Sequence, residues 1–253
     1  MQGLRKFKEH FRNYSNHFMI IGGTGCEMLF KNEGLEFRAT KDIDIIITTP
    51  NLNISEKFRK HFYNFLSNGG YQIYKRDEEY HYYYRFESPE EEGFPSMIEL
   101  FSRAEFKHEE ESEDRYMQLD TDINYHLSAL IMDDNLFNTV LKNTIEIDNF
   151  NLPSPLAMII LKAFAWDELK TRKKKGDRIR SSDIKKHKND ILRLQGLLTE
   201  ESKITVKKEI LDNVVGIIKD ISKVVRLSDI KNVIGRKVSD KKKFFQSITN
   251  KFI

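Results

Sequence analysis

The early part of the chain alternates between helix-like and strand-like spacing of its apolar residues. Leu4, Phe7, Phe11 and Tyr14 recur at intervals typical of an amphipathic helix, whereas the run that follows them is continuously apolar and ends at two glycines. The predicted elements up to residue 66 are helices at Leu4–Tyr14, Glu27–Lys31 and Ser55–Leu66, strands at Phe18–Ile21 and Ile43–Thr48, and a loop at Gly34–Lys41.

Strand-like segments dominate the next stretch. Runs rich in aromatic and β-branched residues, separated by turn-forming residues, predict three strands at Tyr71–Lys75, Tyr80–Glu87 and Pro95–Phe101. For Tyr125–Ile131 and Thr144–Ile147 we expect short strands or a bridge between helix and strand. Helices and strands that alternate first, followed by a group of strands, predict a mixed α/β sheet with flanking helices.

The pattern changes after the Pro153-Ser154-Pro155 sequence, where helical spacing takes over. Leu156–Lys170 and Ser182–Leu197 are predicted helices separated by a break at Gly176-Asp177, and further helices follow through Phe245. We therefore expect an α/β (α+β) domain over residues 1–150 and a helical domain over residues 151–253.

Composition narrows the class of protein. With 253 residues, 39% hydrophobic residues and eighteen Phe, the chain can bury a substantial core. A single cysteine, Cys26, excludes an internal disulfide and a Cys-based zinc site within one chain. No apolar run has the length of a membrane span or follows the basic N-terminus as a signal sequence does, so we expect a cytoplasmic protein without a membrane partner.

The net charge of +3 hides two biased segments. Glu105–Asp114 has six acidic residues against one lysine, and Lys162–Arg193 has twelve basic residues against five acidic ones. A basic segment of this kind can hold a polyanion such as RNA, although a solvated helix face gives the same pattern.

Two carboxylates at the start of an apolar strand carry the strongest chemical signal. Asp42 and Asp44 are two residues apart, so in a strand they project from one face, about 6.6 Å apart along it. Two ionised carboxylates at that distance repel by roughly 2–3 kcal/mol at an effective dielectric of about 20. Hard oxygen ligands without a nearby Cys or His cluster favour Mg²⁺ or Mn²⁺. An exposed polar strand face is the alternative, but the run Ile45–Ile47 favours burial on both faces.

Two further features belong to the same hypothesis. Gly22, Gly23 and Thr24 follow a strand and precede a helix, an arrangement that can hold a phosphate through backbone N–H groups and a hydroxyl, although such turns are common. Glu99 is a single acid in an apolar strand; as a third carboxylate it could bind the metal and act as a general base, or it could simply pair with Arg85 or Arg103.

Several cationic positions are candidate phosphate ligands. Arg38 precedes the acid pair and could meet a phosphate in a bidentate way, or pair with a nearby glutamate. Lys162 lies in an otherwise apolar helical stretch, which is unusual for a lysine. Lys186 and Asp190 are four residues apart in a predicted helix and could form a purely structural pair.

Taken jointly, the segments IIGGTGCEMLF, RATKDIDIII and MIELF resemble the nucleotidyltransferase superfamily, whose members share a polymerase-beta-like catalytic core. The Arg-x-Thr-x-Asp-x-Asp arrangement is more narrowly similar to the AbiEii/AbiGii toxin-type nucleotidyltransferases. The segments LPSPLAMIILKAFAW and SSDIKKHKNDILRL are similar to the helical part of that family, so the resemblance covers roughly residues 15 to 195. Thr24 departs from the family, where serine is frequent at this place.

The resemblance implies an enzyme that moves a nucleoside monophosphate from an NTP to an acceptor hydroxyl, with Mg²⁺ or Mn²⁺, and releases pyrophosphate. It implies a nucleotidyltransferase-type sheet followed by a C-terminal helical domain, and an antitoxin protein as partner, although no antitoxin segment is visible in the chain. The acceptor could be RNA such as tRNA, a protein, or a small molecule such as an aminoglycoside; a catalytically silent nucleotide- or RNA-binding module is the alternative.

The same resemblance assigns the site residues. By position it implies three catalytic, metal-binding acids and a set of nucleotide-binding residues. The acids are Asp42, Asp44 and Glu99, and the nucleotide-binding residues are Gly22, Gly23, Thr24, Arg38, Lys162, Lys186 and Asp190.

Overall fold

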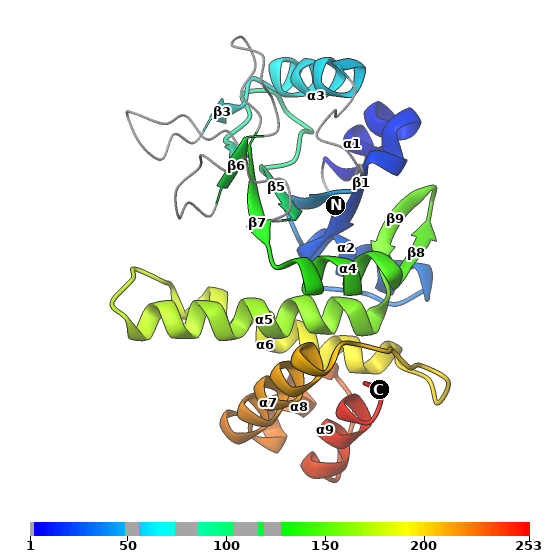
Figure 1. Cartoon of the computed structure of the whole chain (residues 1–253), viewed down its shortest axis with the longest axis vertical. Coiled ribbons are helices and arrows are strands. Elements are labelled where there is room, and N and C mark those ends of the chain that lie inside the picture. The colour runs from blue at the N-terminus through cyan, green and yellow to red at the C-terminus, as the bar shows by residue number, and fades with distance from the viewer. Residues whose placement is uncertain (1–2, 49–55, 74–84, 104–115, 119–127) are drawn as a thin grey trace. The chain divides into compact units, whose positions relative to one another are not determined.

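A computed structural model describes residues 3–48, 56–73, 85–103, 116–118 and 128–253 of the chain (Figure 1). The chain divides into two compact units, Met1–Pro153 and Ser154–Ile253. The first unit contains the sheet and its flanking helices, and the second contains helices α5 to α9. The predicted class, a mixed sheet with flanking helices followed by a helical region, is confirmed.

Within the described residues, nine strands form one sheet with a central order of β3-β4-β5-β2-β1-β9-β8. β2 runs antiparallel to β1 and parallel to β5, and β9 runs parallel to β1, so the sheet is mixed. A second pair, β6 and β7, joins the sheet through the far half of β5. The strands are β1 (Phe18–Ile21), β2 (Asp42–Ile47), β3 (Gln72–Ile73), β4 (Arg85–Glu87), β5 (Met97–Arg103), β6 (Tyr116–Gln118), β7 (Ser128–Met132), β8 (Thr144–Ile147) and β9 (Phe150–Pro153).

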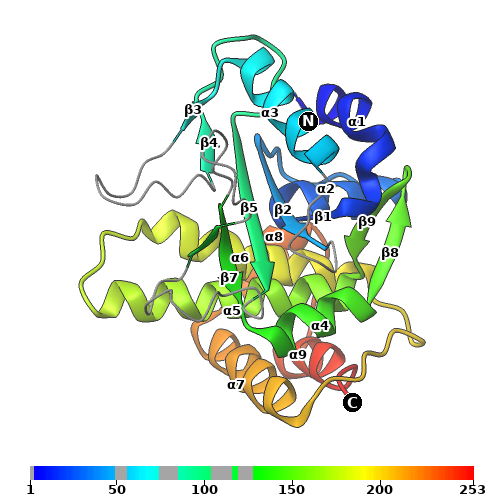
Figure 2. The same cartoon turned by 45° about the horizontal axis from the view of Figure 1, so that its top comes forward.

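An aromatic cluster holds two helices against one face of this sheet. The helices are α1 (Leu4–Phe11) and α3 (Glu56–Gly69), which lie side by side in Figures 1 and 2. Phe7 and Phe11 of α1 contact Phe65 of α3 and Phe18 of β1, with ring centroids 5.3–5.7 Å apart. These rings are almost fully buried, so this cluster is the main core on that face.

Most sequence-predicted elements are found, with shifted ends. β1 has the predicted bounds, whereas the first helix ends at Phe11 and continues as a 3₁₀ turn over Arg12–His17. The second helix, α2 (Gly22–Asn32), begins at the first glycine itself rather than after a glycine turn. The parts of the predicted strands that fall on residues 74–84 lie outside the described residues.

Three elements were not predicted: β6, β9 and helix α4 (Asp134–Lys142). The N-cap of α4 is Asp133, whose side chain accepts a hydrogen bond from the Leu136 backbone N–H. β8 and β9 form a hairpin whose turn residues, Asp148 and Asn149, both have positive φ, as a type I′ turn requires. Both features have a signal in the sequence: an acidic N-cap residue before α4 and an Asp-Asn pair at the turn between β8 and β9.

The second unit is helical throughout its long elements, as the spacing of apolar residues predicts. Ser154 caps α5 by accepting from the Ala157 backbone N–H, and Pro155 takes the first helical position, where its missing N–H costs nothing. The predicted break at Gly176-Asp177 separates α5 from α6. The helices are α5 (Pro155–Lys174), α6 (Ser181–Leu194), α7 (Lys208–Val224), α8 (Leu227–Ile234) and α9 (Lys241–Thr249).

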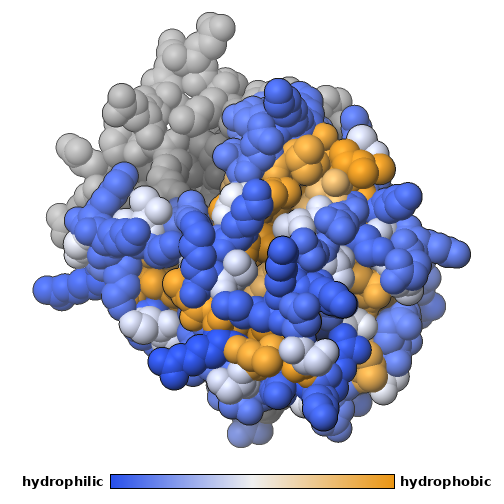
Figure 3. Space-filling model, turned by 90° about the horizontal axis from the view of Figure 1, so that it is seen from below, coloured by the Kyte–Doolittle hydropathy of each residue, from blue (hydrophilic) through white to orange (hydrophobic). Residues whose placement is uncertain are grey.

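The face shown in Figure 3 is mostly hydrophilic, with apolar side chains gathered in smaller patches between charged ones. Among the described residues, no helix is long and apolar enough to cross a membrane.

Candidate functional site

The acid pair lies on the face of the sheet opposite the aromatic core. Side chains alternate along β2, and Ile43 and Ile45 are fully buried, whereas Asp42 and Asp44 between them are partly exposed. On β4, Phe86 contacts Phe62 of α3 with ring centroids 5.8 Å apart, so the α3 side is the apolar face. Asp42 and Asp44 therefore share the other face.

A row of cross-strand partners places a third acid next to the pair. Asp44 of β2 is in register with Glu99 of β5, and Glu99 is in register with Arg85 of β4. Residues in register on neighbouring strands project from the same face. The row therefore consists of Asp44, Glu99 and Arg85, and the predicted third carboxylate lies on the same face as the aspartates.

Glu99 forms an ion pair with Arg85, which is the alternative to metal binding that the sequence suggested. Arg85 donates from Nε and Nη2 to Oε1 of Glu99, at 3.1 and 2.7 Å. Side-chain exposure is 12% for Glu99 and 35% for Arg85, so the pair is largely shielded from water. In this arrangement the Glu99 carboxylate is held on the β4 side of its own strand.

The first residue of α2, Gly22, packs directly against Asp44. Gly22 has a φ of 68°, and a Cβ atom on it would overlap Oδ2 of Asp44. A Cβ atom on Gly23 would lie 2.8 Å from Cγ2 of Thr40 and 3.1 Å from Nη2 of Arg38. Both glycines are therefore needed for close approach, and the predicted residues Gly22, Gly23, Arg38 and Asp44 lie together.

The first turn of α2 has no side-chain cap from its N-cap residue. The N-cap residue is Ile21, whose side chain has no acceptor for the first-turn N–H groups. The positive end of the helix dipole therefore lies at the same place as the glycines and Asp44.

Thr24, which was predicted to contact a phosphate, has its side chain between α2 and β2. Its side chain is fully buried, and its hydroxyl donates to the backbone carbonyl of Asp42 at 2.5 Å. Thr40 lies beside it and donates to Oε2 of Glu27 at 2.8 Å. These bonds tie α2 to the start of β2, so Thr24 positions the acid pair. The reasoning from sequence missed Glu27, which no local signal distinguishes from an ordinary exposed helix acid.

The donor set fits a magnesium-type ion in part. Among the described residues, no group of three or more His, Cys, Asp and Glu side chains is arranged to hold a metal, and Glu99 is paired with Arg85. Two carboxylates suffice for Mg²⁺, which binds through one or two carboxylates, waters and substrate phosphates. Asp42 and Asp44 therefore fit such an ion, and Glu99 fits it only after leaving Arg85.

Two predicted site residues of the second unit, Lys162 and Asp190, form a buried ion pair between α5 and α6. Nζ of Lys162 lies 3.3 Å from Oδ2 of Asp190, and Nη1 of Arg193 lies 3.5 Å from Oδ1 of Asp190. Side-chain exposure is 4% for Lys162 and 0% for Asp190. Lys186, predicted to pair with Asp190, is partly exposed on α6, and the ion pairs of Asp190 are instead with Lys162 and Arg193.

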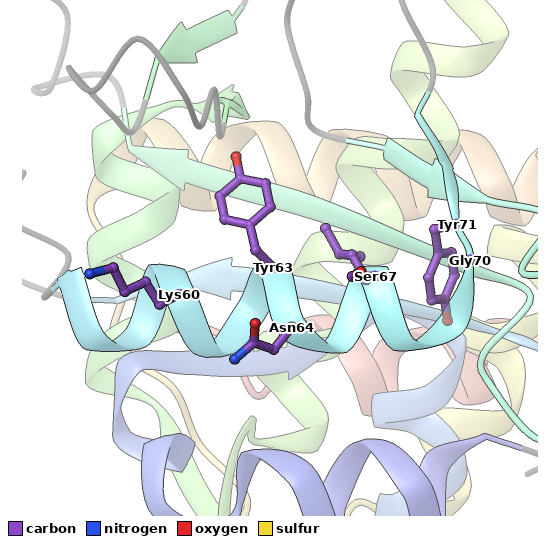
Figure 4. Close-up of a pocket in the computed structure, with 7 residues that line it drawn as sticks. Lys60, Tyr63, Asn64, Ser67, Gly70 and Tyr71 are labelled. Carbon is purple, nitrogen blue, oxygen red and sulfur yellow. The ribbon is translucent and has the colours of Figure 1, made fainter.

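A surface pocket of about 500 Å³ lies elsewhere in the first unit. It is lined by α3 and the residues after it, and no sequence-predicted site residue belongs to it. Figure 4 shows its labelled lining residues Lys60, Tyr63, Asn64, Ser67, Gly70 and Tyr71. α3 packs on the face of the sheet opposite the acids, so this pocket does not extend the candidate site.

Comparison with known proteins gives a weak likeness only. No protein-family model matches the chain, and no curated protein matches it either. The chain is structurally similar to the crystal structure of the Megavirus polyadenylate synthase, with a TM-score of 0.38 and 14% sequence identity. The similarity covers 87% of this chain but 38% of that one. This likeness is too weak to indicate an activity for the chain.

Proposed function

We propose that the protein is a Mg²⁺-dependent nucleotidyltransferase that moves a nucleoside monophosphate from an NTP to an acceptor hydroxyl. The observation that carries the proposal is the convergence of Asp42, Asp44 and Glu99 on one sheet face, with Gly22 packed against Asp44. Three acids beside the N-terminus of α2 would weaken simple anion binding, because like charges repel. A cation bound between the acids and a triphosphate would offset this repulsion.

The reaction forms one bond and breaks one. The acceptor oxygen attacks the α-phosphorus of the NTP, the bond from that phosphorus to the bridging oxygen breaks, and pyrophosphate leaves. The proton of the acceptor hydroxyl passes to a nearby carboxylate or to water. A divalent ion, when bound, supplies neutralisation of phosphate charge in such transfers.

The chain's own residues position the substrate. Asp42 and Asp44 would hold the ion, while first-turn N–H groups at Gly22 and Gly23 and the Arg38 guanidinium would hold phosphate oxygens. Positioning and electrostatics are the protein's main tasks in phosphoryl transfer, and these groups supply both.

For the acceptor we propose RNA, bound by a basic tip on the α5–α6 hairpin. We define this tip as residues 172–188, which contain nine basic and two acidic residues. Both acids are paired within the tip, Asp177 with Arg172 and Asp183 with Arg180, whereas Lys174, Lys175 and other cations are exposed. Lys162, Lys186 and Asp190 are the residues of the helical domain that the AbiEii/AbiGii resemblance implies. The same resemblance implies an antitoxin protein as a partner.

A catalytically silent nucleotide- or RNA-binding module is the second candidate. The Arg85–Glu99 pair favours it, because a carboxylate held by a guanidinium is not available as a third metal ligand. The two candidates differ in whether label is transferred, which makes them separable by experiment.

The test is incubation of purified protein with each α-labelled NTP, Mg²⁺ and total cellular RNA. Label is then measured in RNA, in protein and in small molecules. We expect label in RNA that is lost in Asp44→Asn, while metal-free RNA binding by that variant is preserved or improved. Folded protein that labels none of the three fractions would favour the silent module.

A further inference from the structure

Glu99 has a charged neighbour on each side in its cross-strand row. Asp44 is its partner on β2, and Arg85 is its partner on β4. All three side chains share the face away from the aromatic core. A carboxylate in this place can turn toward a cation beside Asp44 or toward Arg85, but one carboxylate oxygen cannot serve both cations at full strength.

The contacts show which neighbour holds it. Both hydrogen bonds from Arg85 go to one oxygen, Oε1, with Nη2 at 2.7 Å and Nε at 3.1 Å. Charge-assisted bonds from a planar guanidinium are among the stronger polar contacts in proteins, and at 12% exposure this carboxylate is only weakly screened by water. The pair also removes the repulsion that Glu99 would otherwise exert on Asp44.

We propose that Arg85 is a positioning residue that holds Glu99 away from the aspartate pair until a divalent cation displaces it. The inference rests on the proposed function, because it assumes that Asp42 and Asp44 bind the ion. Arg85 acts as an internal cation: it neutralises Glu99 in the metal-free protein and competes with the metal for the same carboxylate. Metal affinity is therefore set lower than three carboxylates alone would give.

The location of Arg85 adds a consequence. It belongs to β4, a strand of three residues that pairs with the first half of β5. Anything that shifts β4 relative to β5 changes the hold on Glu99, so metal affinity is coupled to this short strand.

The experiment is a titration of purified full-length protein with Mn²⁺ alone, read by electron paramagnetic resonance of the free ion. Wild type is compared with Arg85→Gln, Glu99→Gln, the double variant and Asp44→Asn. Arg5→Gln, which removes an exposed cation on α1 whose side chain is 91% exposed, is the charge-matched control.

Arg85→Gln is expected to bind Mn²⁺ roughly tenfold more tightly than wild type, since Glu99 is released and can act as a third carboxylate ligand. In the Glu99→Gln background the same change is expected to give about twofold or less, because its target is gone. Arg5→Gln should bind as wild type does. Arg85→Lys, which keeps the charge but loses the two-pronged contact, is expected to lie between wild type and Arg85→Gln.

The outcomes separate the two claims. If Asp44→Asn loses Mn²⁺ binding while Arg85→Gln binds equally or more weakly than wild type, the role of Arg85 is overturned and the metal site stands. If Asp44→Asn binds Mn²⁺ as wild type does, the proposed metal site itself fails, and the inference fails with it. Should Arg85→Gln not fold by circular dichroism, Arg85→Lys decides: unchanged affinity overturns the proposal.

Discussion

At the scale of single residues, the tightest geometry in the candidate site is between Gly22 and Asp44. The backbone at Gly22 has a positive φ and leaves no room for a Cβ atom, because the Asp44 carboxylate occupies that space. A glycine here is thus required twice, by conformation and by contact. The consequence is that a minimal change at this position disturbs the acid directly.

Gly22→Ala is expected to destabilise the protein by more than about 2 kcal/mol, because positive φ alone costs an alanine roughly 1–2 kcal/mol and the overlap with Asp44 is added to it. Gly34→Ala is the matched control: Gly34 has the same φ of 68° but nothing lies within 4 Å of its added Cβ. Urea denaturation of both variants measures the difference. Equal losses in the two variants would mean that Asp44 does not crowd Gly22.

Sequence reasoning found most residues of the site but not all of their contacts. The spacing of Asp42 and Asp44 placed them on one face, since that follows from strand geometry alone. It could not decide between metal and Arg85 as the partner of Glu99, because register between β4 and β5 is a tertiary property. The buried hydrogen bond from Thr24 to the Asp42 carbonyl was likewise not predicted, because it depends on how α2 folds back on β2.

At the scale of elements, α5 and α6 are joined by a buried ion pair. Lys162 and Asp190 are both almost fully shielded, and Arg193 adds a second cation. Breaking one partner of a buried pair is costly because the remaining charge is left uncompensated.

Asp190→Asn is therefore expected to destabilise the chain by about 3–5 kcal/mol, measured by chemical denaturation. The double variant Lys162→Met, Asp190→Leu should recover a large part of that loss, because apolar residues of similar size tolerate burial. Full additivity of Lys162→Met and Asp190→Leu, each measured alone, would show that the two side chains are not energetically coupled.

A second element contact, between α1 and α3, is sensitive to pH. The rings of His10 and His61 stack with centroids 3.8 Å apart, and Nε2 of each donates to the other's backbone carbonyl, at 2.9 and 2.6 Å. Burial lowers the pKa of His10 below its usual 6.5; the hydrogen bond to the His61 backbone carbonyl opposes this shift, and electrostatic repulsion from His61 adds a smaller lowering effect. The folded state therefore resists protonation more than the unfolded chain does.

Because the pKa of His10 is lower in the folded state than in the unfolded chain, its contribution to stability is fully present above pH 6.5. This contribution is lost as the pH falls from 6.5 through the lowered pKa. Burial lowers the pKa of His17 as well, so it acts in the same direction. Thermal unfolding between pH 7.5 and 5 should show a falling midpoint that is less steep in His10→Gln. A midpoint that rises on acidification in this range would oppose the assignment.

At the scale of the whole molecule, the change of periodicity after Pro153 predicts domains over residues 1–150 and 151–253, and the structure has compact units over Met1–Pro153 and Ser154–Ile253. The parts of the sheet that depend on long-range pairing, such as β9 beside β1, were not anticipated, because local spacing carries no information on strand order.

The basic tip supplies a prediction about RNA binding. The double variant Lys174→Gln, Lys175→Gln removes two exposed cations and should weaken RNA binding and reduce the slope of log affinity against log salt by about 1.4. Lys242→Gln, Lys243→Gln, which removes two exposed lysines from another lysine triplet, is the matched control and should change binding little. Filter binding at several salt concentrations measures both; equal effects would make the tip an ordinary solvated surface.

The most direct test of the central claim is anomalous diffraction from crystals soaked with Mn²⁺ and an NTP that cannot be cleaved between its α- and β-phosphates. A manganese peak is expected within ligand distance of both Asp42 and Asp44, with the triphosphate against the first turn of α2. A manganese peak elsewhere with bound nucleotide, or bound nucleotide with no peak beside these aspartates, would contradict it.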